Sequence, residues 1–560
     1  MRIVSLLLCL GLMLPAATGG ARSPRKPMRL CAEILSYTLE QPSGEEFVAT
    51  LEKKIREYGI GEVMIHGFTP EQWVTNSEFP KVKRVVDAER VAKYRRQLQR
   101  FKRLGVKVTL SGPGPNPPQG FFEAYPEARR IASGEFQRYL RSTTAELFRQ
   151  LPEADAFEIY LWETPFLNDV DFFSGMYWEK TNLDAFASIT PHYGRADFLT
   201  ETLTAYARGA VDAQRQFVFL TFSHVPWQEK LIIEALRQMD GDVPMLLDHK
   251  VQPGDWTPQR PANNVMLNVT DREAILLYDG TGEYWGQSLM PYCYPEEIQQ
   301  RLQHALRNNR SIDTLGMRVH WVNGTTVFGN YNEVNFFALS RLARDPETPI
   351  ERIWSEWAEG RFGAAAAPKV ISALQRTNEI ANRFYYLDGI WVQNHSALSD
   401  LPYLESHFVQ FARSMLLWNP GDFRTAARVR EVTENPREYT VERVKAERVE
   451  ALRLNQLSLD DVETVRGSLN KAEYEKLTGQ LRLQRRFIEV AIPHMEAFLR
   501  YRIQKQRANA ENLHRFEAAL AELEAQAVAV EQEYGERVSI LKASMIRTYI
   551  KQIRAAFPRS

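Results

Sequence analysis

The chain has 560 residues, with 70 Lys and Arg against 70 Asp and Glu. This length exceeds what one compact core usually holds, so two or three domains are expected. The balanced charge removes the electrostatic reason to expect nucleic acid or an anionic membrane surface as a partner. The 11 Trp suit the apolar faces of sugar rings where they fall in loops, although most aromatic side chains pack in protein cores.

The N-terminal residues predict a secretory signal peptide over 1–21. Arg2 precedes an apolar run at 3–14, and small residues follow at 15–21, the order found in such signals. The apolar run is too short to span a bilayer, and no other run reaches that length. We therefore expect a periplasmic or secreted protein without a membrane span.

Two cysteines, Cys31 and Cys293, remain after removal of the signal. They can pair in an oxidising compartment, but two cysteines far apart in the sequence form no disulfide framework. The histidines are scattered without metal-ligand spacing, so we expect no metal and no other cofactor.

Short apolar runs alternate with stretches of helical periodicity from residue 28 to residue 345. Strands are expected at 30–37, 62–66, 107–111, 156–162, 217–222, 245–248, 275–279 and 315–321, and helices at 45–58, 86–104, 134–151, 196–214, 228–239, 295–309 and 332–344. This alternation predicts an α/β fold, a (β/α)8 TIM barrel over 28–345. A doubly wound open sheet is the alternative, but the sequence has no Gly-rich phosphate fingerprint to support it.

From residue 346 to residue 560 strand patterns vanish, and the sequence predicts an α-helical C-terminal domain. Helices are expected at 471–502 and 537–553, and a further one carries an apolar seam of Leu513, Phe516, Leu520, Leu523, Ala527 and Val530. The seam is shorter than a sustained coiled coil, which favours an intramolecular helical bundle. A homodimer through these helices is the alternative.

Three carboxylates follow predicted strands: Glu163 after the fourth, Asp255 after the sixth and Glu283 after the seventh. Barrel enzymes carry their active-site groups at this end of the strands. A carboxyl group beside Trp162 would be desolvated, which raises its pKa and suits Glu163 as a general acid. Asp255 and Glu283 follow neighbouring strands, so the pair can deprotonate a water. Inverting glycosidases hold acid and base about 6.5–9.5 Å apart to admit that water.

Each of these residues also has a structural interpretation. Glu163 can cap a loop, and Asp255 and Glu283 can form salt bridges with Lys250 or Arg260. Lys250 can bind a substrate carboxylate or neutralise the two neighbouring carboxylates, and the sequence does not favour either role. Candidate sugar-binding residues with a competing structural interpretation, as core tryptophans or satisfied histidines, are Trp162, Trp256, Trp285, Trp321, His249 and His320, with His66 and His224 also at strand ends.

Four segments resemble glycoside hydrolase family 67, the α-glucuronidases. The run 249–256, His-Lys-Val-Gln-Pro-Gly-Asp-Trp, is similar to the family's strand-six motif, with a lysine five residues before a catalytic aspartate. The run 281–287, Thr-Gly-Glu-Tyr-Trp-Gly-Gln, is similar to its second-base motif, and 161–163 to the strand with its acid. Residues 319–346 resemble its eighth strand and following helix.

The resemblance implies an inverting exo-α-glycosidase on a (β/α)8 barrel. Glu163 would protonate the leaving oxygen, Asp255 and Glu283 would activate water, and Lys250 would contact a uronate carboxylate. The chain departs from the family in three ways: it has no counterpart of the N-terminal β domain, and two cations expected in the family are Ile159 and Thr221 here. The expected substrate is therefore a uronate or a related sugar on a plant or algal polysaccharide or oligosaccharide.

Two other functions fit the same residues. A non-catalytic barrel would use the carboxylates only to hydrogen-bond a glycan. A uronate lyase would use Lys250 or a histidine as the base and release an unsaturated product.

Overall fold

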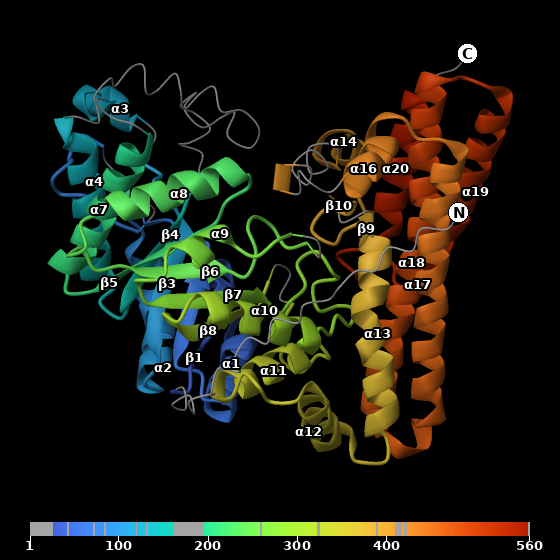
Figure 1. Ribbon diagram of the computed structural model, residues 1–560, viewed down its shortest axis with the longest axis horizontal. Helices are drawn as coiled ribbons and strands as arrows, with labels where there is room; N and C mark the ends of the chain where they lie inside the picture. Colours follow the sequence, from blue (N-terminus) through green and yellow to red (C-terminus); the bar gives the residue numbers. More distant parts are fainter. Residues whose placement is uncertain are drawn as a thin grey trace, which may run out of the picture.

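The computed structural model describes residues 26–557, except for 42–43, 71–72, 83–85, 119, 130–132, 162–194, 258–259, 322–324, 388–389, 409–416 and 419–422. The predicted signal peptide at 1–21 and the predicted site residues Trp162 and Glu163 lie outside the described residues. The described chain forms a barrel followed by a bundle of long helices (Figure 1). Of the helices that are described, none combines the length and apolar character that crossing a bilayer requires.

Eight parallel strands close into a barrel in chain order, from β1 beside β2 to β8 beside β1. They are β1 (Arg29–Leu35), β2 (Glu62–His66), β3 (Lys107–Pro113), β4 (Ala156–Tyr160), β5 (Gln216–Leu220), β6 (Leu246–Lys250), β7 (Ala274–Asp279) and β8 (Ile312–Arg318). The predicted (β/α)8 barrel is thus confirmed, and the open-sheet alternative is wrong. Because parallel strands in a closed barrel all end on one face, the side chains that follow them converge there.

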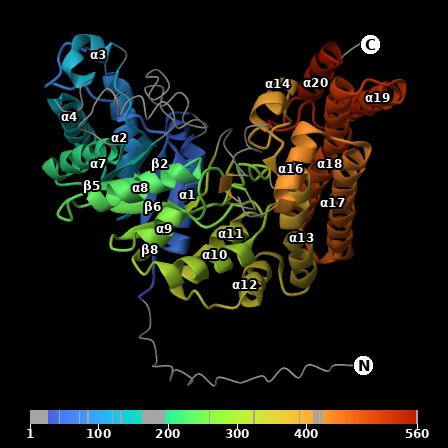
Figure 2. The same ribbon diagram turned by 45° about the horizontal axis from the view of Figure 1, so that its top comes forward.

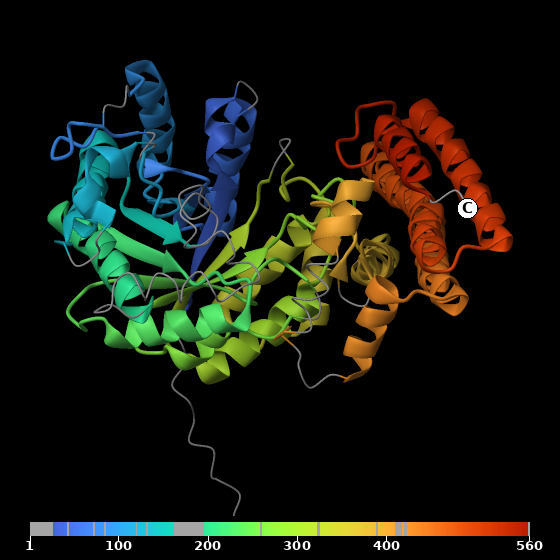
Figure 3. The ribbon, with the colours of Figure 1, turned by 90° about the horizontal axis from the view of Figure 1, so that it is seen from above.

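Helices surround the strands, as the view from above shows with the blue-to-yellow elements (Figure 3). They are α1 (Gly44–Tyr58), α2 (Ala88–Arg103), α3 (Phe121–Ala124), α4 (Glu135–Gln150), α7 (Arg195–Asp212), α8 (Pro226–Gln238), α9 (Asn264–Asn268), α10 (Pro295–Asn308) and α11 (Glu333–Arg344). Apolar residues on their inner faces form one continuous core with the outward-facing strand residues.

The inside of the barrel is layered along the strands. Cys31, Met64, Ala156, Val218, Leu246 and Ile275 form a separate apolar cluster. Two residues further along their strands, Glu33, Glu158 and Asp248 point inward by the two-residue period of a strand and are fully buried or nearly so. The polar interior therefore begins above the apolar layer, towards the carboxyl ends of the strands.

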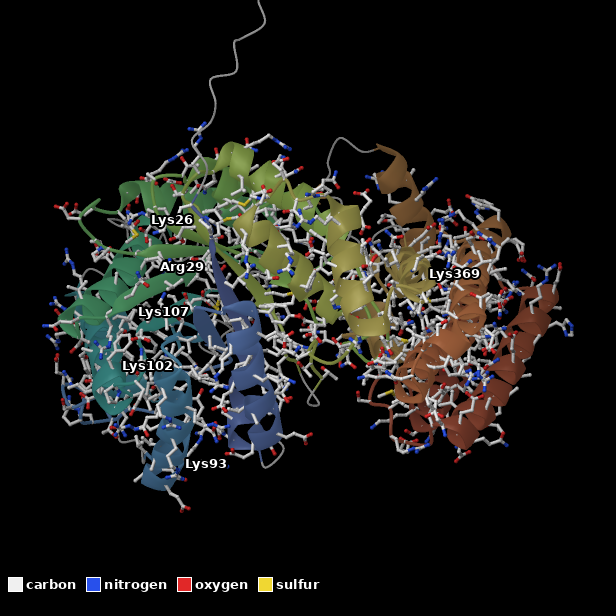
Figure 4. All side chains as sticks on the ribbon, turned by 90° about the horizontal axis from the view of Figure 1, so that it is seen from below. Lys26, Arg29, Lys93, Lys102, Lys107 and Lys369 are labelled. Carbon is white, nitrogen blue, oxygen red and sulfur yellow. The ribbon has the colours of Figure 1, made fainter. Side chains whose placement is uncertain are left out.

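The opposite, amino-terminal end of the barrel is closed by ion pairs. Arg29 contacts Asp313 at 2.8 Å and Lys107 contacts Glu62 at 3.1 Å. Seen from below, the labelled Arg29 and Lys107 lie on the barrel side of the molecule, and Lys369 lies on the helical side (Figure 4). At this end the first residues of the strands form salt bridges. The site described below lies at the other end.

After α11 the chain is helical, with one short hairpin. The elements are α12 (Ile350–Phe362), α13 (Ala367–Tyr385), β9 (Tyr386–Leu387), β10 (Ile390–Trp391), α14 (Leu401–Tyr403), α16 (Phe423–Glu434), α17 (Glu438–Thr464), α18 (Lys471–Gln506), α19 (Ala510–Glu533) and α20 (Ala543–Ala556). Two views place α12 and α13 where the barrel joins the bundle (Figures 1 and 2). Long helices that are consecutive in the chain pack side by side, α17 on α18, α18 on α19 and α19 on α20.

The seam predicted in α19 is largely an intramolecular core. Phe516, Leu520, Leu523, Ala527 and Val530 are buried within the chain, whereas Leu513 is 40% exposed and does not belong to the seam. The last helix starts at Ala543 instead of 537, and the homodimer stays a prediction. Neither cysteine forms a disulfide: Cys31 lies inside the barrel, and Cys293 Sγ donates to Tyr331 O at 3.5 Å.

Candidate active site

A cavity of about 260 Å³ opens at the carboxyl ends of the barrel strands. Its walls come from the ends of β2 and of β4 to β8, from the loops that follow them, and from one loop of the helical region. The lining residues are His66, Tyr160, Leu220, Phe222, Lys250, Asp255, Leu277, Glu283, Tyr284, Arg318, Trp321 and His395. Of the predicted site residues, Asp255, Glu283, Lys250 and Trp321 lie around this cavity.

Glu283 is held by a tight loop after β7. The carboxylate of Asp279, the last residue of β7, accepts hydrogen bonds from the backbone N–H groups of Thr281, Gly282 and Glu283, the last at 2.7 Å. Thr281 Oγ1 donates to the same carboxylate at 2.7 Å. Gly282 has φ +69°, a left-handed conformation that glycine adopts at no steric cost. The Thr-Gly-Glu segment thus fixes where the Glu283 side chain starts.

Arg318, the last residue of β8, joins two buried carboxylates. Its guanidinium contacts Glu283 Oε2 at 2.6 Å and Glu33 Oε1 at 2.9 Å, and all three side chains are at most 7% exposed. The guanidinium also lies over the Trp321 ring, 4.0 Å from the ring centroid. Burial raises the pKa of Glu33, but Arg318 and His66 outweigh it and hold that pKa below its ordinary value. Arg318 therefore keeps Glu33 ionised.

Asp255 lies in the loop that follows β6, five residues after Lys250, the last residue of that strand. Burial raises the pKa of the Asp255 carboxyl, but the Lys250 ammonium, with His224, His395 and Arg260 behind it, brings it below its usual value. The ammonium lies over two aromatic faces, 4.6 Å from the Phe222 centroid and 4.4 Å from the Trp256 centroid. Such cation–π contacts hold a buried lysine cation in place. Lys250 thus lowers the pKa of Asp255, one of the two roles expected for it.

The carboxyl groups of Asp255 and Glu283 interact electrostatically in the cavity. Burial raises the pKa of Glu283, Arg318 and His395 lower it, and the nearby charge of Asp255 raises it again. Two neighbouring acidic groups that differ in pKa are typical of sites that move protons.

One wall of the cavity is aromatic. His66 stacks on Tyr160 with centroids 5.2 Å apart and planes 8° apart, and its ring lies 6.2 Å from that of Trp321. Burial lowers the pKa of His66 to about 4, so its imidazole is neutral at neutral pH. The wall offers ring faces to a ligand of intermediate polarity, such as a sugar.

Four predicted binding residues lie elsewhere. His249 lies between Asp248 and Lys250 on β6, so strand alternation directs it outward, where Thr221 Oγ1 is 2.8 Å from its Nδ1. His320 is also buried outside the cavity, against Phe47. Trp285 stacks on Tyr292 and donates to Asn382 Oδ1 at 2.7 Å. Trp256 packs under Lys250 and does not line the cavity.

Sequence reasoning missed Arg318 and His395. Arg318 ends β8, so the strand-end rule that selected Asp255 would also have selected it. His395 lies far beyond the barrel in the chain, and no periodicity or motif points to it. Within the described ranges, no group of three or more His, Cys, Asp or Glu is arranged to hold a metal ion.

Comparison of the sequence with protein-family models and with curated proteins gives no match. Among solved structures, a GH138 enzyme targeting pectin rhamnogalacturonan II has a similar fold, with a TM-score of 0.54 and 13% identity over 90% of this chain and 62% of that chain. The chain therefore spans less than two thirds of that enzyme's length. The likeness shows a shared fold, one that a glycoside hydrolase uses.

Two further glycoside hydrolases align more distantly. An O-GlcNAc hydrolase from Thermobaculum terrenum has a TM-score of 0.42 and 11% identity over 95% of both chains. A GH115 4-O-methyl-α-glucuronidase with specificity for decorated arabinogalactans has a TM-score of 0.45 and 11% identity over 95% of this chain and 62% of that chain.

Proposed function

We propose that the chain is a secreted glycoside hydrolase, an inverting exo-α-glycosidase of the α-glucuronidase type. Its substrate is a uronate or a related sugar on a plant or algal polysaccharide or oligosaccharide. The observation that carries the proposal is that the carboxylates of Asp255 and Glu283 line one cavity at the carboxyl ends of the barrel strands. The motifs similar to family 67 and the fold shared with the GH138 enzyme support it.

Asp255 is suited to the role of general base. Its lowered pKa leaves it ionised near neutral pH, and an ionised carboxylate accepts a proton from water. In the proposed step the water oxygen bonds to the anomeric carbon while its proton passes to Asp255. Glu283, fixed by Arg318 at 2.6 Å, accepts a hydrogen bond from the same water and orients it.

The general acid of this proposal is Glu163. The bond from the anomeric carbon to the leaving oxygen breaks as this acid delivers its proton to that oxygen, which balances the proton taken up by the base. The assignment comes from the family resemblance of 161–163 and from Tyr160, the last residue of β4 and three residues earlier in the chain, which lines the cavity. The low pKa of Asp255 also supports an acid other than Asp255.

Lys250 and Trp321 are assigned to substrate binding. Lys250 supplies a cation at the cavity wall for a uronate carboxylate, and Trp321 with Tyr160 supplies ring faces for a sugar. A carboxylate ligand and Asp255 then share the same ammonium group, so binding and acidity at this site are coupled.

The test is hydrolysis of aryl glycosides and uronate-bearing oligosaccharides by the wild type and by Asp255→Asn, Glu283→Gln and Glu163→Gln. Each is expected to lower turnover by about 10²–10⁴-fold, the usual contribution of a general acid or base. The matched control is Asp313→Asn, which removes a carboxylate at the opposite end of the barrel. Proton NMR of the first anomer released is expected to show inversion. Wild-type turnover in Asp255→Asn, or retention of configuration, would refute the assignments.

The same experiment separates the two alternative functions. A glycan-binding barrel is favoured by one observation, the neutralisation of Glu283 by Arg318, and predicts oligosaccharide binding with no product after long incubation. A uronate lyase predicts an unsaturated product that absorbs ultraviolet light.

A further inference from the structure

One loop of the helical region reaches the cavity of the barrel. It runs from Asn394 to Ala397, between β10 and α14, and its His395 lines the cavity together with Asp255 and Glu283. Figure 1 shows β9 and β10 between the barrel and the long helices. The cavity is therefore not built by the barrel alone.

The loop is fastened to the segment that carries Glu283. Ser396 Oγ accepts from Gly286 N at 2.8 Å and donates to Glu283 O at 2.7 Å. Gln287 Nε2 donates to His395 O at 2.5 Å. Ser396 is fully buried. The backbone of His395 and that of Glu283 are thus tied to each other through one hydroxyl group, although they come from different parts of the chain.

The backbone of the loop is held in an unfavourable conformation. His395 has φ +45° and Ser396 has φ +68°, and two consecutive residues with side chains in the left-handed region are strained. Such strain persists only where surrounding contacts impose it, and it concentrates at functional sites. Here the imposing contacts are the three hydrogen bonds to the Glu283 segment.

The imidazole that this backbone presents is open. The His395 side chain is exposed, and its ring meets the Tyr284 ring edge-on, with centroids 5.3 Å apart. Neither ring nitrogen has a hydrogen-bond partner among the described residues, although the imidazole is close enough to lower the pKa of both Asp255 and Glu283. The fixed backbone thus holds an open imidazole beside two carboxylates, where the imidazole can bind a ligand in the cavity.

We propose that His395 is a substrate-binding residue that donates a hydrogen bond to an oxygen of the sugar held between Asp255 and Glu283. This inference rests on the proposed function, because it takes the ligand to be a sugar. It adds that the helical region is part of the site: it supplies His395 for contact with the substrate and Ser396 as a positioning residue for Glu283.

The test compares His395→Ala and His395→Gln with a matched control, His514→Ala, which removes an exposed histidine on α19 far from the cavity. Binding of D-glucuronate and D-galacturonate is measured by calorimetry, and KM and kcat are measured on the best substrate of the glycoside screen. For His395→Ala we expect an about tenfold weaker Kd and a similar rise in KM, with kcat changed by less than about threefold, as for loss of one hydrogen bond. His395→Gln, which keeps a donor, is expected to recover part of the affinity, and the control to match the wild type.

Ser396→Ala tests the positioning role separately. It is expected to lower kcat more than it raises KM, because it frees the segment that fixes Glu283 without removing the imidazole.

The outcomes separate the two proposals. If the wild type binds a sugar and His395→Ala weakens it, but no glycoside is hydrolysed, the inference stands and the hydrolase proposal fails. If the wild type hydrolyses and His395→Ala has wild-type Kd and KM, the inference is overturned and the hydrolase proposal stands. If the wild type binds no sugar at all, both are overturned.

Discussion

Replacing Glu158 by Gln is expected to change how the stability of the barrel depends on pH. Glu158 on β4 and Asp248 on β6 are fully buried below the cavity, within hydrogen-bonding reach of each other. Ser111 Oγ donates to Glu158 Oε1 at 2.6 Å, but neither oxygen of Asp248 meets a donor among the described residues. One proton held between the two carboxyl groups satisfies both.

The size of the effect follows from the raised pKa values. Burial raises the pKa of Asp248 to about 8 and that of Glu158 well above its ordinary value. In the unfolded chain an aspartic acid loses its proton near pH 4, so above that pH the folded state holds a proton that the unfolded state has released. The resulting stabilisation is complete at low pH and is lost as the pH rises through the folded pKa. Its slope is about 1.4 kcal/mol per pH unit.

The variant Glu158→Gln supplies the amide N–H as a permanent donor to Asp248, so the pair no longer needs the proton. We expect the free energy of unfolding of the variant to fall less steeply with pH than that of the wild type, by about 1.4 kcal/mol per pH unit. The measurement is the midpoint of thermal unfolding, followed by tryptophan fluorescence between pH 5 and pH 9. The difference between the two midpoints should change by about 1–2 °C per pH unit for a chain of this size, with the variant ahead at the alkaline end.

Buried histidines make stability rise with pH, the opposite direction, but their effect is the same in both proteins and cancels in the difference between the two midpoints. Burial lowers the pKa of His66 to about 4 and that of His249 to about 3, so both proteins gain stability equally as the pH rises towards neutrality. The control Glu46→Gln changes an exposed residue of α1 and should track the wild type at every pH. A midpoint difference between wild type and Glu158→Gln that does not vary with pH would refute the shared proton.

Two further substitutions test the cations of the site. Arg318→Met removes the cation between the buried carboxylates of Glu33 and Glu283, so it should lower the free energy of unfolding by about 3–5 kcal/mol as well as turnover; an unfolding midpoint within a degree of the wild type would contradict this. Lys250→Met removes the main cation that lowers the pKa of Asp255, so the acidic limb of the kcat/KM profile should move to higher pH. An unmoved limb would show that Asp255 is not the base.

The barrel was predictable because its strands are short apolar runs between helices with clear periodicity. The predicted second strand has the same bounds as β2, Glu62–His66, and most other elements differ by a few residues at their ends. The eighth strand ends at Arg318, earlier than expected. The sequence keeps alternating apolar and polar residues beyond the strand end, with Val319 and Trp321, so the pattern does not mark where the loop begins.

The candidate site was predictable only where one strand end carried the information. Asp255 and Glu283 follow neighbouring strands, so their approach to one cavity follows from the fold. His249 could have been excluded by strand alternation alone, because Lys250 next to it points inward. The place of His395 depends on a contact between a loop of the helical region and the loop after β7, and no local pattern in the sequence encodes such a contact.

The family resemblance predicts cations at two positions that are Ile159 and Thr221 in this chain, and the structure shows whether their loss affects substrate selectivity. Ile159 points outward and packs against Gly114: its Cγ2 lies 3.3 Å from the position that a Cβ atom on Gly114 would occupy. Thr221 forms a hydrogen bond with the outward-facing His249. Neither position on this backbone faces the cavity, so these replacements take no charge from it. The cations that line it, Lys250 and Arg318, come from β6 and β8. A uronate in this cavity therefore meets positive charge from the β6–β8 side, next to the two carboxylates. Arg318 is paired with Glu33 and Glu283, and Lys250 lowers the pKa of Asp255, so a uronate carboxylate would share either cation with a buried carboxylate of the site.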